Sequence, residues 1–239
     1  MKYFNKYYWI RKIFINKFIS LFISKNSLNK IVFNSIYKSN HWNKSSKFEP
    51  NNQSYSGPGS IPNSIQTNSL IIQLEKFFKE KNIKKILDAP CGDCAWIKKI
   101  FTTEIEYTGI DIVEDLINKN KIEFILNKNI NFYCRDMTEF DEFHDYDFIL
   151  LRDFFIHLPI KKIKKILINL KKSNCKYFAF NSYENTENNK EILTGQHRKI
   201  NLLKDPFNLS RPYFKVLEIK NDNFPDKKDK DNYIYIYKN

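Results

Sequence analysis

The pattern of apolar and polar positions is regular from Asn68 onward and predicts an alternation of strands and helices. Short apolar runs of four to eight residues predict buried strands, and longer stretches with apolar residues every three or four positions predict amphipathic helices. Strands are expected within residues 84–90, 105–112, 130–136, 146–153, 176–183, 213–220 and 232–238. Helices are expected within residues 68–82, 96–101, 113–125 and 159–173.

This order predicts an α/β fold. Five strands alternate with helices, and the last two strands follow each other without a helix, as in a hairpin. We therefore expect a doubly wound, seven-stranded, mostly parallel sheet whose last strand is antiparallel. Ligands of such sheets bind at the carboxyl ends of the strands, next to the first strand.

The residues before the sheet differ in composition from the rest of the chain. Residues 1–35 alternate basic and apolar positions and predict an amphipathic basic helix, residues 36–67 are rich in Ser, Asn, Pro and Gly, and residues 68–239 form the α/β domain. No stretch approaches the roughly 20 apolar residues of a membrane span. The predicted helix could bind a membrane interface through residues 1–25, or it could pack against its own domain or a partner. A third alternative is an organelle transit peptide, which is less favoured because such segments are richer in Arg and Ser.

Charge is concentrated in the N-terminal part of the chain. The net charge is +13, yet residues 1–48 hold ten Lys or Arg and no acid, so the remainder carries thirty bases against twenty-seven acids. The remainder is therefore close to neutral and the basic character belongs to the tail, so the composition argues against a nucleic-acid partner. The chain has four cysteines and no small-residue cleavage site after the apolar stretch, which favours a reducing, cytoplasmic setting. A cytoplasmic protein that contacts a membrane peripherally through the tail is the alternative location.

Acidic residues stand where the first three strands end. Asp88 ends the first strand and is followed by the single glycine Gly92, so the dinucleotide pattern G-x-G-x-x-G is absent. Asp111 ends the second strand, 23 residues later, and Asp136 ends the third. One such Asp is more often a helix cap. Three in register favour a ligand with several hydrogen-bond donors and a positive charge.

These segments resemble the class I S-adenosylmethionine-dependent methyltransferases. "ILDAPCGDCAWI", "YTGIDIV", "YCRDMT" and "YDFILLRDFFIHL" look like the first four motifs of that family, and the first is similar to D-x-P-C-G-D-F-x-W of a bacterial and viral branch. The branch also has counterparts of "SGPGS" and "RKINLLKDPFNLSRP", so the resemblance covers about residues 36–239. Cys94, Ala95 and Ser210 depart from the branch pattern and remove no expected ligand contact.

The resemblance implies S-adenosylmethionine as cofactor. It places Asp88 and Gly92 at the methionine part, Asp111 at the ribose hydroxyls, and Asp136 with Met137 at the adenine, and it adds Arg152 to the cofactor-binding set. Methyl transfer is an in-line displacement, and its barrier falls mainly through alignment of donor and acceptor. The implied activity is that of a methyltransferase.

The acceptor side is expected after the fourth strand. Asp153 and His157 are the catalytic candidates, with His157 either the base that takes a hydroxyl proton or a structural residue packed over the cofactor. The Pro-Pro signature of nucleic-acid amino-methyltransferases is absent there. A lid that also lines the acceptor pocket is expected from residues in two segments, Ser56, Gly57, Gly59, Ser60, Arg198, Asn201, Phe207 and Asn208.

The polar lining of that lid favours a sugar or glycan-precursor hydroxyl as acceptor. Another small metabolite or a protein side chain is the alternative within the same activity. A non-catalytic cofactor-binding scaffold and an NAD-dependent dehydrogenase are the alternatives of other classes, and titration with S-adenosylmethionine against NADH separates them. Cys91 and Cys94 have the spacing of a zinc or redox pair, but no second pair completes four ligands, so no metal site is expected.

Overall fold

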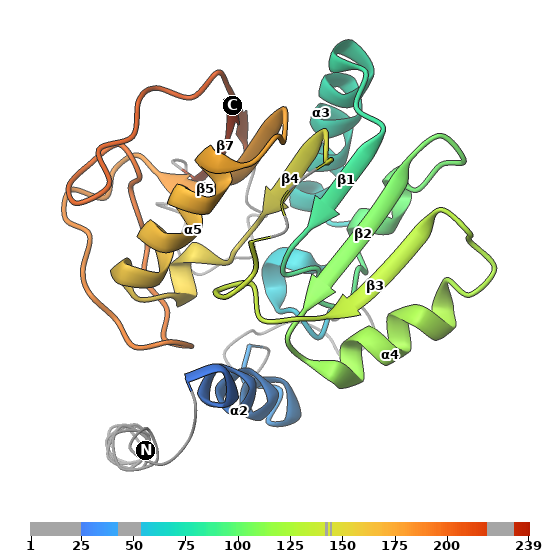
Figure 1. Ribbon diagram of the computed structural model, residues 1–239, viewed down its shortest axis with the longest axis horizontal. Coiled ribbons are helices and arrows are strands. Elements are labelled where there is room, and N and C mark those ends of the chain that lie inside the picture. The colour runs from blue at the N-terminus through green and yellow to red at the C-terminus, as the bar shows by residue number, and fades with distance from the viewer. Residues whose placement is uncertain (1–24, 43–53, 142, 144, 219–231) are drawn as a thin grey trace.

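The computed structural model describes residues 25–42, 54–141, 143, 145–218 and 232–239 (Figure 1). Its centre is a seven-stranded sheet in the order β3-β2-β1-β4-β5-β7-β6. The strands are β1 Lys85–Asp88, β2 Glu106–Asp111, β3 Ile130–Cys134, β4 Phe148–Leu151, β5 Tyr177–Tyr183, β6 Phe214–Leu217 and β7 Asn232–Lys238. β1 to β5 pair in parallel, and β7 pairs antiparallel with both β5 and β6, which confirms the predicted doubly wound sheet with an antiparallel last strand.

The strand order reverses next to β1, and this reversal positions the site. The chain moves outward from β1 through β2 to β3, then returns to place β4 on the other side of β1. The connections leaving the carboxyl ends of β1 and β4 therefore diverge and leave a crevice between them. The register that pairs Asp88 with Leu150 on one side and Gly109 on the other aligns these ends.

Helices cover both faces of the sheet because the buried strands are apolar on both sides. They are α2 Lys25–Lys38, α3 Ile65–Lys81, α4 Glu114–Glu123 and α5 Ile160–Lys172, with short 3-10 turns η2 Pro58–Ser60, η3 Ile97–Ile100 and η4 Phe155–His157. One buried cluster joins α3 and η3 to the sheet, and a second joins α5 and η4 to the opposite face. α3 begins three residues earlier than predicted because Ser64 caps it, accepting a hydrogen bond from the Thr67 N–H.

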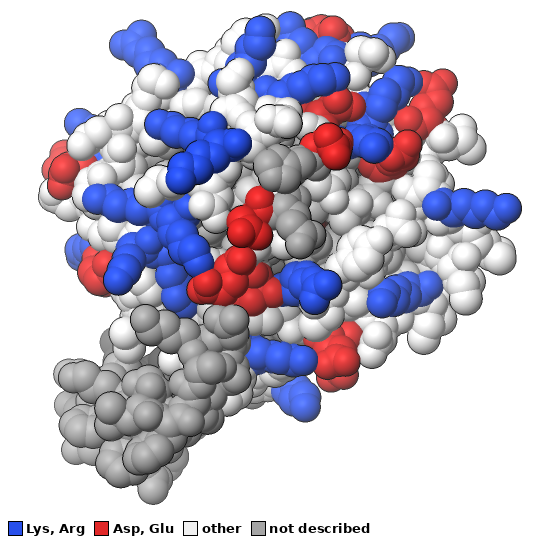
Figure 2. Space-filling view, in the orientation of Figure 1, with Lys and Arg blue, Asp and Glu red and all other residues white. Residues whose placement is uncertain are grey.

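Helix α5 is strongly amphipathic. Ile163, Ile166, Leu167 and Leu170 are buried on one side. Figure 2 shows lysine side chains gathered over this helix, and those exposed are Lys161, Lys164, Lys165, Lys171 and Lys172. No helix among the described residues is long and apolar enough to cross a membrane.

Helix α2 lies at the edge of the sheet where the arrows of β1, β2 and β3 end (Figure 1). It runs across residue 35, where the sequence places the boundary between the basic tail and the Ser/Asn/Pro/Gly segment. The amphipathic pattern of residues 1–24 lies outside the described residues, as do residues 43–53 of the segment that follows. Helix α2, which contains the described part of the basic tail, therefore belongs with the α/β domain.

Candidate functional site

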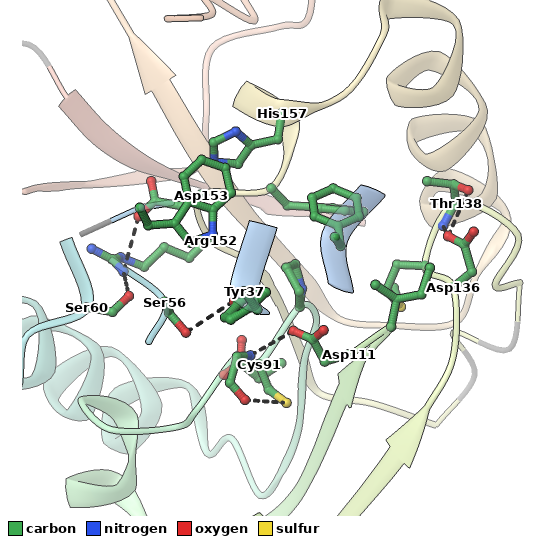
Figure 3. A pocket seen from close by; sticks show the side chains of 18 of the residues that line it. Tyr37, Ser56, Ser60, Cys91, Asp111, Asp136, Thr138, Arg152, Asp153 and His157 are labelled. Atoms are coloured by element: carbon green, nitrogen blue, oxygen red, sulfur yellow. Dashed lines mark hydrogen bonds and ion pairs between the residues drawn. The ribbon is translucent and has the colours of Figure 1, made fainter. Parts of the chain in front are cut away.

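The three strand-end acids line one pocket at the carboxyl edge of the sheet (Figure 3). Asp88 is the last residue of β1, Asp111 is the last residue of β2, and Asp136 follows β3 by two residues. Each strand ends where its local apolar pattern stops, and the parallel pairing brings the three ends to the same edge. The pocket also includes Gly92, Met137, Arg152, Asp153, His157, Ser56 and Ser60 of the predicted set.

Asp88 lines the pocket and is almost completely buried. The Tyr107 hydroxyl donates to Asp88 Oδ2 over 2.7 Å. Burial raises the pKa of Asp88 to about 7, and the hydrogen bond from Tyr107 and the charge of Arg152 limit this rise. A carboxylate kept in so apolar a place is stabilised by a positively charged ligand.

Asp111 is equally buried and is held by the backbone. The N–H groups of Gly92 and Val113 donate to its two carboxylate oxygens over 3.1 and 2.9 Å. Burial raises the pKa of Asp111 to about 6, and these backbone hydrogen bonds oppose the rise. Its orientation is therefore fixed before any ligand binds.

Gly92 is required by the close approach of two chain segments. Its φ is 56°, in the left-handed region, and a Cβ at this position would lie 2.1 Å from Ser56 Oγ. The turn at Gly92 thus leaves no room for a side chain between β1 and the segment that carries Ser56.

Asp136 is fixed from two directions. Its Oδ1 accepts hydrogen bonds of 2.9 Å from both the N–H and the hydroxyl of Thr138. Its Oδ2 accepts from Asn29 Nδ2 of α2 over 2.7 Å. Helix α2 therefore contributes to the site directly.

Residues 54–60 form one wall of the pocket, and Asp93 anchors them. Its carboxylate accepts hydrogen bonds from Ser54 Oγ at 2.9 and 2.8 Å and from the Tyr55 N–H at 2.7 Å, while its own N–H donates to Ser56 Oγ at 3.2 Å. Tyr37 of α2 reaches the same place, 3.4 Å from Ser56 Oγ. Two segments that precede the α/β domain in sequence thus meet over the Gly92 turn.

Arg152 is buried at the other end of the pocket within a network of acids. Its Nε and Nη2 contact Glu218 Oε1 at 2.7 and 2.6 Å, and Nη1 lies 3.2 Å from Asp153 Oδ2. Burial lowers the pKa of this guanidinium, but Asp153 and Glu218 more than offset that effect and raise the pKa above its ordinary value. Arg152 also donates to the Gly59 carbonyl over 2.7 Å, so it ties β4 and β6 to the 54–60 segment.

His157 lines the pocket from the 3-10 turn η4. Its Nδ1 is 3.0 Å from the Gln196 carbonyl oxygen, and its ring packs against Trp42 with 4.3 Å between centroids. Burial lowers the pKa of His157 to about 3, with the hydrogen bond to Gln196 opposing the fall. A carbonyl only accepts, so the neutral ring carries its proton on Nδ1 and leaves the Nε2 lone pair available.

Four predicted lid residues do not reach the pocket. Arg198 is buried beneath η4, where it donates to the carbonyls of Phe155 and Leu158 over 3.0 and 2.9 Å. Asn201 is also buried and donates to the carbonyls of Glu184 and Thr186. Phe207 packs on the core, and Asn208 is exposed and donates to Asp205. Among the described residues, only the first of the two predicted lid segments borders the pocket, with Gly57 and Gly59 flanking Ser56 and Ser60.

Several site residues carry no signal in the sequence pattern. Phe33, Tyr37 and Trp42 line the pocket from the region of α2, and Glu218 lies behind Arg152. Asp93 has a local signal, since it stands within the first motif. Cys91 and Cys94 are buried at the Gly92 turn, burial raises their thiol pKa values, and no group of three or more potential metal ligands occurs in the described part of the chain.

The lining of the pocket is electrostatically negative. Its charged wall residues are four carboxylates, Asp88, Asp111, Asp136 and Asp153, and one guanidinium, Arg152, which Glu218 neutralises from behind. Aromatic rings of Phe33, Trp42, Trp96 and Phe154 complete the walls. This combination suits an organic cation that also has hydroxyl and amino donors.

Comparisons with known proteins agree with this fold. Residues 86–173 match the family model described as methyltransferase domain. The structure is similar to the N-methyltransferase NodS from Bradyrhizobium japonicum WM9 in complex with S-adenosyl-L-homocysteine, with a TM-score of 0.56 and 12% identity over 85% of this chain and 97% of that one. It is also similar to magnesium protoporphyrin IX methyltransferase from Synechocystis PCC 6803 with bound S-adenosylmethionine, with a TM-score of 0.55 and 10% identity over 87% and 94% of the two chains.

A third similar structure is the bifunctional kinase-methyltransferase WbdD, with a TM-score of 0.52 and 15% identity over 73% of this chain and 39% of that one. The search of curated proteins gave no match. The strand order, the site at the β1 edge and the family match agree with one another. The chain therefore has the fold of the class I methyltransferases, and its residues 86–173 match the family model of a methyltransferase domain.

Proposed function

We propose that the protein is an S-adenosylmethionine-dependent methyltransferase that methylates a hydroxyl of a sugar or glycan precursor. The observation that carries the first part is the convergence of Asp88, Asp111 and Asp136 on one negative pocket beside the Gly92 turn. A sulfonium cofactor offers the positive charge, the ribose hydroxyls and the amino group that such a set of acceptors recognises.

The residues present fit this cofactor. The Gly92 turn lines the pocket without a side chain of its own, and Asp111 is presented by two backbone N–H groups for two hydroxyl donors. We assign Asp88 and Gly92 to the methionine part, Asp111 to the ribose, Asp136 and Met137 to the adenine, and Arg152 to the support of the pocket wall. When bound, the cofactor supplies an activated methyl group.

The acceptor is assigned to the side of the pocket near Asp153 and His157. The neutral His157 ring, with Nδ1 engaged by Gln196, presents Nε2 as a hydrogen-bond acceptor that orients the hydroxyl of the acceptor. Trp42 beside it offers a flat apolar face next to polar groups, which suits a sugar ring. The similar structures do not choose the acceptor, because their names cite an N-methyltransferase and a methyltransferase of magnesium protoporphyrin IX.

Cofactor binding is tested by calorimetric titration with S-adenosylhomocysteine and S-adenosylmethionine, alongside fluorescence titration with NADH. We expect saturable binding of the first two and none of the third. Binding of NADH alone would replace the proposal with a dehydrogenase.

The acceptor is tested with S-adenosylmethionine that carries a labelled methyl group and a panel of sugar nucleotides, small metabolites and peptides. Label in an alkali-stable sugar ether supports a hydroxyl acceptor, and label in a peptide or another metabolite contradicts it. His157→Gln should lower methyl transfer at least about tenfold without changing the affinity for S-adenosylhomocysteine. Equal activity of this variant and the parent protein would leave His157 a structural role.

A further inference from the structure

Asn29 of α2 is a buried polar residue whose side chain is fully engaged at the pocket. It is 2% exposed, and its Nδ2 donates to Asp136 Oδ2 over 2.7 Å and to Thr138 Oγ1 over 3.0 Å. Its Oδ1 accepts a hydrogen bond from Lys162 Nζ of α5. A carboxylate only accepts and an ammonium only donates, so the orientation of the amide is fixed by its partners.

Among the described residues, these contacts leave Asp136 with one position for a ligand. A carboxylate has about four acceptor positions. The N–H and hydroxyl of Thr138 occupy two on Oδ1, and Asn29 occupies one on Oδ2. Asp136 lines the pocket, so the remaining position on Oδ2 is available to a single donor from a bound molecule.

Helix α2 is held firmly enough to fix Asn29. Val32 and Ile36 are buried against Gly195, where an added Cβ would lie 2.5 Å from Val32 and 3.0 Å from Ile36. Lys162, which binds the Asn29 oxygen, also donates to Thr194 Oγ1 over 3.0 Å. The helix and the loop around Gly195 therefore hold Asn29 against Asp136 together.

We propose that Asn29 is a positioning residue that makes the site selective for a 6-aminopurine. By occupying one side of Oδ2, it turns the free lone pair of Asp136 toward the pocket to accept one hydrogen bond from the exocyclic amino group of the cofactor's base. A 6-oxopurine places an oxygen there instead, and two facing acceptors leave both without a donor. This inference rests on the proposed function and adds the origin of its nucleoside selectivity.

The test compares the affinities of S-adenosylhomocysteine and S-inosylhomocysteine by calorimetry. The two ligands differ at the 6-position of the purine, amino against oxo, and at N1, which carries a proton only in the inosyl compound. For the parent protein we expect a preference of at least about tenfold for the adenosyl compound, the size of one hydrogen bond to a charged group. For Asn29→Ala we expect the preference to fall below about threefold, mainly through weaker binding of the adenosyl compound.

Asn34→Ala is the matched control, because Asn34 lies on the same helix and its side chain donates to the Lys30 carbonyl of its own turn. It should retain the parent preference. Asn29→Asp is the second variant and keeps the size of the side chain and its contact with Lys162. It faces Asp136 with a second carboxylate, and such a pair shares a proton. We expect this variant to lose the adenosyl preference or reverse it.

Equal weakening of both ligands by Asn29→Ala would give Asn29 a structural role and overturn the inference. So would a parent-like preference in Asn29→Asp, whether or not Asn29→Ala folds. A parent protein that binds both ligands equally also contradicts the inference while leaving the proposed cofactor in place. Failure of the parent protein to bind either ligand contradicts the proposed function itself.

Discussion

At the scale of single residues, the strand-end acids share a position in the fold but differ in their surroundings. Asp111 receives two backbone N–H groups, whereas Asp88 receives one hydroxyl and faces the charge of Arg152. Burial raises both pKa values, to about 6 for Asp111 and about 7 for Asp88. Asp111 is therefore the one better prepared to accept neutral hydroxyl donors as a carboxylate.

Asp111→Ala removes an oriented acceptor for two hydroxyls. We expect the affinity for S-adenosylhomocysteine to fall by about 2 to 3 kcal/mol, the range of hydrogen bonds to a charged group. Calorimetric titration measures this, with Asp115→Ala on the exposed first turn of α4 as the control. A loss of only a few tenths in Asp111→Ala would place the ribose elsewhere.

Asp88→Asn tests the cost of a buried carboxylate. The folded pKa of Asp88 is about 7, above its ordinary value, so the folded protein binds more protons than the unfolded chain between these values. The stability contributed by this group is present at low pH and is lost as the pH rises through 7.

Asparagine cannot ionise, so the variant should be more stable than the parent at pH 8 by on the order of 2 kcal/mol and not at pH 4. Urea unfolding of both ligand-free proteins across this range measures the difference. A difference that is the same at every pH would show that Asp88 does not titrate in this window.

At the scale of elements, the site is assembled by two segments that enclose the Gly92 turn. The 54–60 segment is bound through Asp93 on one side and through Arg152 on the other. Helix α2 adds Tyr37 above it and Asn29 beside Asp136. The contacts of Asp93, Arg152 and Asn29 join segments that are distant in sequence, so the wall depends on a few hydrogen bonds to charged groups.

Asp93→Ala should release the 54–60 segment from the domain. Its loss leaves Ser54 Oγ and the Tyr55 N–H without their carboxylate partner, and we expect about 2 kcal/mol of destabilisation. Limited proteolysis should then cleave within residues 54–60 at least about tenfold faster than in the parent. Asp141→Ala, on an exposed residue away from this wall, is the control. Unchanged cleavage within the segment would contradict the anchoring role of Asp93.

At the scale of the whole molecule, the described domain begins with α2 and not with the α/β alternation. We expect a chain starting at Lys25 to bind S-adenosylhomocysteine like the full protein, because it retains Asn29 and Tyr37. A chain starting at Ser39 lacks both and should bind at least about tenfold more weakly. Calorimetry on the two shortened proteins measures these affinities. Equal affinities would show that α2 does not contribute to the site.

The basic tail is expected to bind anionic membranes. Residues 1–24 contain five Lys or Arg among aromatic and aliphatic residues, and the exposed lysines of α5 add to the positive surface (Figure 2). Sedimentation with vesicles that contain phosphatidylserine should retain the full protein at low salt and release it at high salt. The chain starting at Lys25 should sediment less at low salt. Equal sedimentation of the two proteins would contradict membrane binding by the tail and favour its packing or a targeting role.

The sequence by itself determined the sheet and the acids at its edge. Strand ends are local events: an apolar run stops at Asp88 and again at Asp111, and parallel strands bring such ends together. The antiparallel last strand follows in the same way from two apolar runs without a helix between them. The charge imbalance of the tail was also visible from composition alone.

Only the tertiary structure decided which distant residues complete the site. Asn29 meets Asp136 across 107 positions and Arg152 meets Glu218 across 66, and neither pair leaves a periodic trace in the chain. Arg198 has the polar character expected of a lid, yet it is buried beneath η4 because two backbone carbonyls there need donors. Periodicity reports which face of an element is buried, whereas the partner of a buried polar group depends on where the chain returns in space.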